Sequence, residues 1–399
     1  MPACRSQLLV REPQRPLIVG MATARFGVLV TVVVALAACG VRPPSSSSAP
    51  GAVVAQSGAQ GHRAGDLGVR FGSLPSGPTA TITDVEGVLV GHHTLRDGRA
   101  CTGVTVVLPH GGNPFLERVP AGVFVANGFG KPFGFVQVEE LGELEAPIAL
   151  TGTLNVPRVA DGLLDHVLGL PGCERVRSVN PVVLETNDGR LNDLRSRPVH
   201  TEHVAEALAN ASPHTEVGSV GAGTGTICFG YKGGIGSASR VAGRYTVGVL
   251  AQTNFGGDLV VAGVPMKEPV GKGEPQEAGS CAIVIATDAP LDARNLRRLA
   301  ARSFVGMART GASFSNGSGD YAIAFSTARQ LRRSGGDRRL EGERLGNAAM
   351  SPLFVAVAEA TEEAIIDSLC AAQTTEANGR RVEAIPFEEV VARLRAAGR

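Results

Sequence analysis

Tryptophan is absent from this 399-residue sequence, aromatic residues make up 4% of it, and the net charge is only +1. The 38 Lys and Arg residues balance 37 Asp and Glu residues, and no long basic run concentrates positive charge in one segment. Because proteins that bind nucleic acid need a basic surface, we expect no nucleic-acid partner. The hydrophobic content of 43% is sufficient for a substantial core, which excludes a disordered chain.

Cysteine and metal-binding motifs are sparse. The seven cysteines are too scattered for a disulfide framework, and without a Cys-x-x-Cys pair there is no support for a zinc ribbon or a thioredoxin-type site. His200 and His203 are three residues apart, as two ligands on one helical turn can be, but no third ligand is signalled. The adjacent His92 and His93 would point to opposite faces of a strand. We therefore expect no metal and no cofactor.

Glycine is abundant, with 52 residues, but it does not form a nucleotide-binding motif. The run 221–236 contains neither Gly-x-Gly-x-x-Gly nor Gly-Lys-Ser/Thr, so we interpret it as tight turns and close strand packing around a site. A Gly-x-Ser-x-Gly nucleophile elbow is also absent, and Gly317-Ser318-Gly319 comes nearest to it.

The N-terminal part resembles an export signal. Residues 26–38 form an apolar run that fits the hydrophobic region of a signal peptide and is too short to span a membrane. The run ends in Leu-Ala-Ala-Cys-Gly, which resembles a bacterial lipobox, so Cys39 is the expected lipidation site and the cell envelope the expected location. An ordinary secretory signal, leading to a secreted or periplasmic protein, is the alternative. Met21 is at a suitable distance to be the true start.

The segment after the signal predicts a tether. We assign residues 1–39 to the signal segment and residues 40–66, which are rich in Pro, Ser, Gly and Ala, to a disordered linker. Residues 67–399 then form one folded domain.

Periodicity in the folded part predicts strands and helices in mixed order. Short β-branched runs predict strands at 104–108, 122–126, 148–151, 182–185, 246–252, 282–287 and 321–327. Apolar spacing predicts helices at 159–168, 200–209 and 291–309, one capped by Ser351 and Pro352, and one opened by Pro386. Because the strands come in adjacent groups, we expect an α+β layered sandwich and not a doubly wound parallel sheet.

One serine stands between a polar linker and an apolar strand. Ser280 follows Gly279 and the polar residues 271–277. A chain cut before Ser280 would carry an α-amino group with a pKa of roughly 7.7–8.0, which can act as the base for the serine's own hydroxyl. Cys281 is a rival nucleophile, but it would point to the opposite face of the strand, so we interpret it as core.

A second polar group precedes the last predicted strand. Ser318 and Asp320 are two residues apart in an extended segment, so their side chains would share one side. Taken alone, this segment is typical of an ordinary polar turn.

Several segments together resemble the family of L-aminopeptidase/D-Ala-esterase/amidases and β-aminopeptidases, which are self-processing N-terminal serine hydrolases. The resemblance covers about residues 75–370 in order, which is more specific than any single motif. The segments that carry it are 103–112, 127–130, 137–147, 185–193, 221–240, 252–256, 279–280 and 316–321.

The resemblance implies a four-layer αββα sandwich of the N-terminal-nucleophile-hydrolase type. It implies self-cleavage between Gly279 and Ser280 into two chains that stay associated, with Ser280 as the nucleophile. Asn254 matches the family's oxyanion-hole asparagine, and Ser318 and Asp320 match the residues that orient and assist the nucleophile. Short peptides, amides or esters are the implied substrates, and a homo-oligomer is expected.

An aminopeptidase must also hold the ammonium group of its substrate, which requires a carboxylate near the pocket. Glu139 and Glu140 are the candidates, with a surface acidic pair as the alternative. The sequence departs from the family at Gly152, where many relatives have asparagine, and in having no tyrosine before Tyr231.

Two other functions remain open at this stage. One is an acyltransferase like the ornithine acetyltransferases, whose nucleophile is threonine, and the other is a non-catalytic lipoprotein that binds peptides.

Overall fold

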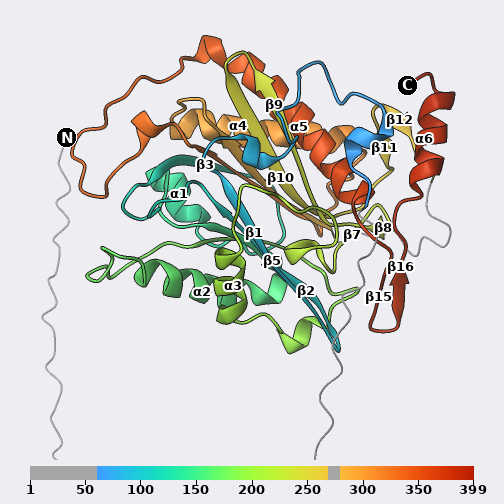
Figure 1. The fold of residues 1–399 in the computed structure, drawn as a ribbon, viewed down its shortest axis with the longest axis horizontal. Helices are drawn as coiled ribbons and strands as arrows, with labels where there is room; N and C mark the ends of the chain where they lie inside the picture. The colour runs from blue at the N-terminus through green and yellow to red at the C-terminus, as the bar shows by residue number, and fades with distance from the viewer. Residues whose placement is uncertain (1–60, 268–278) are drawn as a thin grey trace, which may run out of the picture. The chain divides into compact units, whose positions relative to one another are not determined.

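Two β-sheets face each other in the centre of the fold (Figure 1). The computed structural model describes residues 61–267 and 279–399, which belong to a single compact unit. One sheet has four strands in the order β1-β2-β5-β6, and the other has six in the order β4-β3-β14-β13-β10-β9. The first sheet consists of β1 (Leu89–Asp97), β2 (Ala100–Leu108), β5 (Ile148–Gly152) and β6 (Val182–Thr186). The second consists of β3 (Val119–Gly128), β4 (Glu143–Leu144), β9 (Ile235–Ala242), β10 (Tyr245–Asn254), β13 (Ser280–Thr287) and β14 (Gly319–Ser326).

Helices cover the outer face of each sheet (Figure 1). The long helices α4 (Ala293–Arg309) and α5 (Met350–Cys370) pack on the six-stranded sheet, and α2 (Val156–Leu168) and α3 (Thr201–Ala209) pack on the four-stranded sheet. The predicted αββα sandwich is therefore confirmed. The short elements are α1 (Phe135–Leu141), α6 (Phe387–Ala396), and the hairpins β7 (Ile227–Cys228) with β8 (Tyr231–Lys232), β11 (Val260–Val261) with β12 (Val264–Pro265), and β15 (Thr375–Ala377) with β16 (Arg380–Val382).

Alternation along β13 shows how the layers are held together. Cys281, Ile283 and Ile285 belong to the core under α4 and α5, whereas Ala282 and Val284 belong to the core between the two sheets. A strand buried on both faces in this way needs apolar residues at every position, which is why its sequence is a continuous apolar run. The residues that follow the parity of Ala282 therefore face the space between the sheets.

The structure contains elements that the sequence pattern did not predict. β9 is built from small residues, because α5 crosses it so closely that a Cβ at Gly236 would lie 1.8 Å from the carbonyl oxygen of Ala364. β1 is an edge strand with several polar, partly exposed positions, so it lacks the apolar run of the inner strands. The predicted cap at Ser351 is wrong, since α5 already begins at Met350.

The fold begins slightly before the predicted boundary near Asp66. Residues Ala64–Leu67 form a 3-10 helix, and the Arg63 guanidinium lies 2.7 Å from the carboxylate of Asp367 on α5. This contact joins residues that are 304 positions apart, so local composition could not indicate it. The signal segment, Cys39, Met21 and the linker up to residue 60 lie outside the described residues and stay predictions. Within residues 61–267 and 279–399, no helix has both the length and the apolar character needed to cross a membrane.

Candidate active site

The ends of three neighbouring strands of the six-stranded sheet form the site. Ser280, the first residue of β13, is opposite Asn254 at the end of the antiparallel strand β10 and opposite Gly319 at the start of the parallel strand β14. Ser280 is buried, with 5% of its surface exposed. By the parity of the strand, its side chain faces the space between the sheets, while Cys281 lies in the core under the helices. The interpretation of Cys281 as core is therefore confirmed.

The carbonyl of Gly279 is polarised by two donors. Its oxygen accepts a hydrogen bond from the Ser280 hydroxyl at 2.6 Å and from the Gly319 N–H at 3.1 Å. A Cβ at position 279 would lie 2.7 Å from the Cα of Phe255, so only glycine allows this close approach. The Ser280 hydroxyl thus lies next to a carbonyl whose oxygen has a backbone donor, and such a donor stabilises negative charge that develops on the oxygen.

The Asn254 amide is held at both ends. Its Oδ1 accepts a hydrogen bond from the Ile227 N–H at 3.0 Å, and its Nδ2 donates to the carbonyl oxygen of Asn187 at 3.0 Å. A side-chain amide carries two N–H donors, so the second one can serve an oxyanion. The side chain is 2% exposed and cannot rotate without breaking these bonds.

Ser318 and Asp320 lie together beside the 279–281 backbone. The Ser318 hydroxyl donates to Asp320 Oδ1 at 2.9 Å, so the two side chains share one side as predicted. Burial raises the pKa of Asp320 to about 6, although hydrogen bonds from Ser318 and from the Cys281 N–H oppose this shift. Burial, followed by the nearby Asp320, raises the pKa of the Cys281 thiol, which makes it a poor nucleophile.

A buried carboxylate and a buried phenol lie near the site. The Glu185 side chain at the end of β6 is 3% exposed, and Glu185 Oε1 accepts from the Lys131 N–H at 3.0 Å. A Cβ on Gly130 would lie within 2.7 Å of both Glu185 Oε1 and the Tyr321 hydroxyl oxygen, so these two groups border the same glycine. Burial, then Glu185 and Asp320, raise the pKa of Tyr321, so its hydroxyl remains protonated.

The structure does not bring the predicted ammonium anchors to Ser280. Glu139 and Glu140 lie on the exposed side of α1, and the Glu139 carboxylate lies 3.6 Å from Arg297 on the outer helix α4. Glu185 is a buried carboxylate near the site that the sequence pattern did not single out. Its local signal is an acidic residue directly at the end of a buried apolar strand.

The departure at Gly152 has a local cause. A Cβ at this position would lie 2.7 Å from Oδ2 of Asp188, so the Asp188 carboxylate occupies the space that a side chain at 152 would need. Asp188 is fully buried, and burial raises its pKa to about 6 despite hydrogen bonds from Thr102 and Asn192.

The histidines do not form a metal centre. His92 bonds to Thr105 at 2.9 Å, whereas the His93 ring stacks on that of His203 at 4.5 Å, so the adjacent pair points to opposite faces as predicted. Across residues 61–267 and 279–399, no group of three or more His, Cys, Asp or Glu side chains is placed to hold a metal ion.

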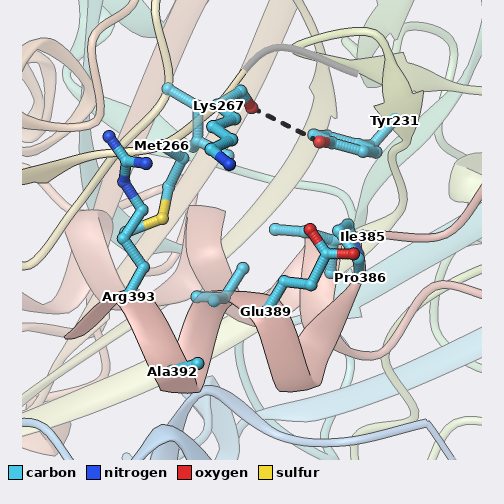
Figure 2. Close-up of a pocket in the computed structure, with 10 residues that line it drawn as sticks. Tyr231, Met266, Lys267, Ile385, Pro386, Glu389, Ala392 and Arg393 are labelled. Atoms are coloured by element: carbon cyan, nitrogen blue, oxygen red, sulfur yellow. Dashed lines mark hydrogen bonds between the residues drawn. The ribbon is translucent and has the colours of Figure 1, made fainter. Parts of the chain in front are cut away.

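A separate cavity of about 370 Å³ lies between Tyr231, the β11–β12 hairpin and α6 (Figure 2). Its walls combine apolar side chains such as Ile385 with the charged groups of Lys267, Glu389 and Arg393, and the Tyr231 hydroxyl donates to the Lys267 carbonyl oxygen at 3.4 Å. None of the predicted catalytic residues lines it.

Comparison with known proteins gives consistent matches over most of the chain. The model of a family described as Peptidase family S58 matches residues 80–382. The beta-peptidyl aminopeptidase BapA of Sphingosinicella xenopeptidilytica is 40% identical over 380 residues, which cover 86% of this chain and 94% of that protein.

Solved structures agree with the sequence match. The PH0078 protein of Pyrococcus horikoshii OT3 superposes with a TM-score of 0.80 and 46% identity, covering 85% of this chain and 100% of that one. The L-aminopeptidase D-Ala-esterase/amidase of Ochrobactrum anthropi, described as a new variant among the Ntn hydrolase fold, gives a TM-score of 0.79 at 35% identity. It covers 84% of this chain and 99% of that one.

Proposed function

This chain belongs to peptidase family S58 and is an aminopeptidase, and on that premise we propose that it cleaves itself before Ser280 and uses this serine as its nucleophile. The observation that carries the proposal is the Gly279-Ser280 bond at the start of β13. Its carbonyl oxygen accepts from the serine's own hydroxyl and from the Gly319 N–H, beside the Ser318–Asp320 pair.

Self-cleavage proceeds by an acyl shift. Ser280 Oγ bonds to the carbonyl carbon of Gly279 while the peptide C–N bond breaks, and the freed nitrogen takes up the hydroxyl proton. Water then hydrolyses the ester, which leaves a carboxylate on Gly279 and a free amine on Ser280. Ser318 and Asp320, which run alongside this backbone, hold the new amine.

Hydrolysis of substrates reuses the same groups. The Ser280 amine accepts the hydroxyl proton, Ser280 Oγ forms the acyl-enzyme, and the second N–H of Asn254 stabilises the oxyanion. The ammonium group of the substrate pairs with Glu185, whose carboxylate borders Gly130 together with the Tyr321 hydroxyl. That hydroxyl also borders Gly319, the register partner of Ser280.

The test of self-cleavage is a mass measurement of the purified protein. We expect two pieces on a denaturing gel, with the smaller one beginning at Ser280 and ending at Arg399, because the Ser280 hydroxyl lies next to the carbonyl that it would attack. N-terminal sequencing of the smaller piece identifies the bond. An intact chain after long incubation at neutral pH would contradict the proposal.

The role of Glu185 has a matched control on α1. Glu185→Gln should raise KM for peptides with a free amino terminus by about 10-fold or more, because a buried ammonium loses its counter-charge. Glu139→Gln removes an exposed carboxylate and should leave KM unchanged. Equal effects of the two substitutions, measured by steady-state kinetics, would remove Glu185 from the substrate site.

The pH dependence tests the coupling between Asp320 and the Ser280 amine. With a pKa of about 6, Asp320 is ionised before the amine, whose ordinary value is roughly 7.7, loses its proton. A carboxylate raises the pKa of a nearby amine, so Asp320→Asn should move the rising limb of kcat/KM to lower pH and reduce its maximum.

The control for this shift is Ser318→Ala, which removes the partner hydroxyl but keeps the carboxylate charge. Its rising limb should move less than that of Asp320→Asn, because the charge that raises the pKa of the amine is kept. A limb that does not move in processed Asp320→Asn enzyme would show that the two groups are not coupled.

A further inference from the structure

A lysine is buried next to the site without a part in the reaction described above. Lys232, in the two-residue strand β8, is 0% exposed. Its Nζ donates to the carbonyl oxygens of Gly223 at 2.9 Å and Gly233 at 2.8 Å, and among the described residues it makes no salt bridge. Burial lowers its pKa to about 7. Burying an amine without a carboxylate partner is unfavourable, so its position calls for a specific role.

The two carbonyls lie on either side of the β7–β8 hairpin. Gly223 precedes the hairpin and Gly233 follows it. The Lys232 amine therefore links the chain segment that enters the hairpin to the segment that leaves it. Thr226 supports the same closure, because its hydroxyl donates to the Gly223 oxygen at 3.0 Å and its carbonyl accepts from the Gly233 N–H at 3.0 Å.

This hairpin holds the oxyanion residue. Ile227 is the register partner of Lys232, and the Ile227 N–H donates to Asn254 Oδ1 at 3.0 Å. After the hairpin, the carbonyl of Gly234 accepts a hydrogen bond from the N–H of Thr253, the residue before Asn254. The orientation of the Asn254 amide therefore depends on the loop that Lys232 closes.

We propose that Lys232 is a positioning residue that fixes the amide of Asn254 for oxyanion stabilisation by tying the Gly223 and Gly233 carbonyls together. The inference rests on the proposed role of Asn254. A loosened amide weakens the bond formed in the transition state more than substrate binding, so the defect is expected in kcat and not in KM.

Lys232→Met keeps the aliphatic stem and removes the donors. We expect kcat to fall on the order of 10-fold, which is part of the roughly 10²–10³ that one oxyanion donor supplies, with KM within about twofold of wild type. In an Asn254→Ala background the same substitution should cost nothing more, because the group through which it acts is gone.

A milder variant covers the case in which Lys232→Met does not fold. Thr226→Val removes one donor to the same Gly223 oxygen and should lower kcat about threefold, again only when Asn254 is present. Thr310→Val is its matched control, since Thr310 is equally buried and also donates to a carbonyl three residues back, that of Met307, at the end of α4. This control should leave kcat unchanged.

The outcomes of this double-mutant cycle distinguish a failure of the positioning role of Lys232 from a failure of the proposed function. Losses that are equal with and without Asn254, or a Thr310→Val loss as large as that of Thr226→Val, would overturn the positioning role and leave the proposed function intact. Normal turnover by Asn254→Ala alone would overturn the positioning role together with the oxyanion role of Asn254, whereas the role of Ser280 is tested separately by Ser280→Ala.

Discussion

Replacing Ser280 with alanine is expected to leave the chain intact and without measurable aminopeptidase activity. In the proposed mechanism the same hydroxyl attacks the Gly279 carbonyl and forms the acyl-enzyme, so one substitution removes both reactions. Loss of a nucleophilic serine lowers kcat by on the order of 10⁶ in comparable enzymes. Mass spectrometry of the purified variant and a peptide-hydrolysis assay measure the two effects separately.

Cys281 supplies the control for this substitution. Its side chain lies in the core under the helices, so Cys281→Ala should still cleave itself and still hydrolyse peptides, with a loss of stability from the small cavity. A processed and active Ser280→Ala enzyme would show that another residue is the nucleophile. A processed but inactive one would show that cleavage of the chain does not need this hydroxyl.

The second large effect is expected from Asn254→Ala. Removing an oxyanion donor lowers kcat for peptides by about 10²–10³, equivalent to about 3–4 kcal/mol of transition-state stabilisation. Self-cleavage should continue, because the Gly279 oxygen takes its hydrogen bonds from Gly319 and Ser280 and not from Asn254. The variant is therefore expected as two chains with poor turnover.

Asn295→Ala is the control, since Asn295 is equally buried, with 2% of its surface exposed, but lies on the outer helix α4. It should lose stability without losing kcat. If Asn254→Ala stays intact, the amide also serves the precursor. If it turns over normally, the amide serves neither reaction.

Elements that are determined by neighbouring residues could be predicted from the sequence, and elements that are determined by contacts with distant segments could not. Inner strands such as β13 are apolar at successive positions because both faces are covered, so a local run identifies them. The partners of Ser280 were also accessible, because they lie within short segments that resemble a known family. β9 was missed because its small residues are explained only by the close crossing of α5.

The proposed ammonium anchor shows the limit of the same reasoning. Glu139 and Glu185 are both acidic residues in segments that resemble the family, and the position of Glu185 at the end of an apolar run does not show what its carboxylate contacts. The difference lies in the surroundings of the two side chains, because Glu185 at the end of β6 is buried beside the Tyr321 hydroxyl, whereas α1 turns the exposed Glu139 toward Arg297. Only the tertiary packing around each side chain decides between them.

The strand order of the six-stranded sheet has a consequence for refolding. β13 and β14 lie at its centre, with β3 on one side and β10 on the other, so the C-terminal piece contributes the middle of a sheet whose flanks belong to the N-terminal piece. If the chain is cut before Ser280 as proposed, neither piece can complete this sheet alone. Refolding, which is unimolecular for the uncut chain, then becomes an association of two chains, and the stability of the cut protein depends on its concentration. The Gly279–Ser280 bond would thus be one that the chain needs only once, to assemble.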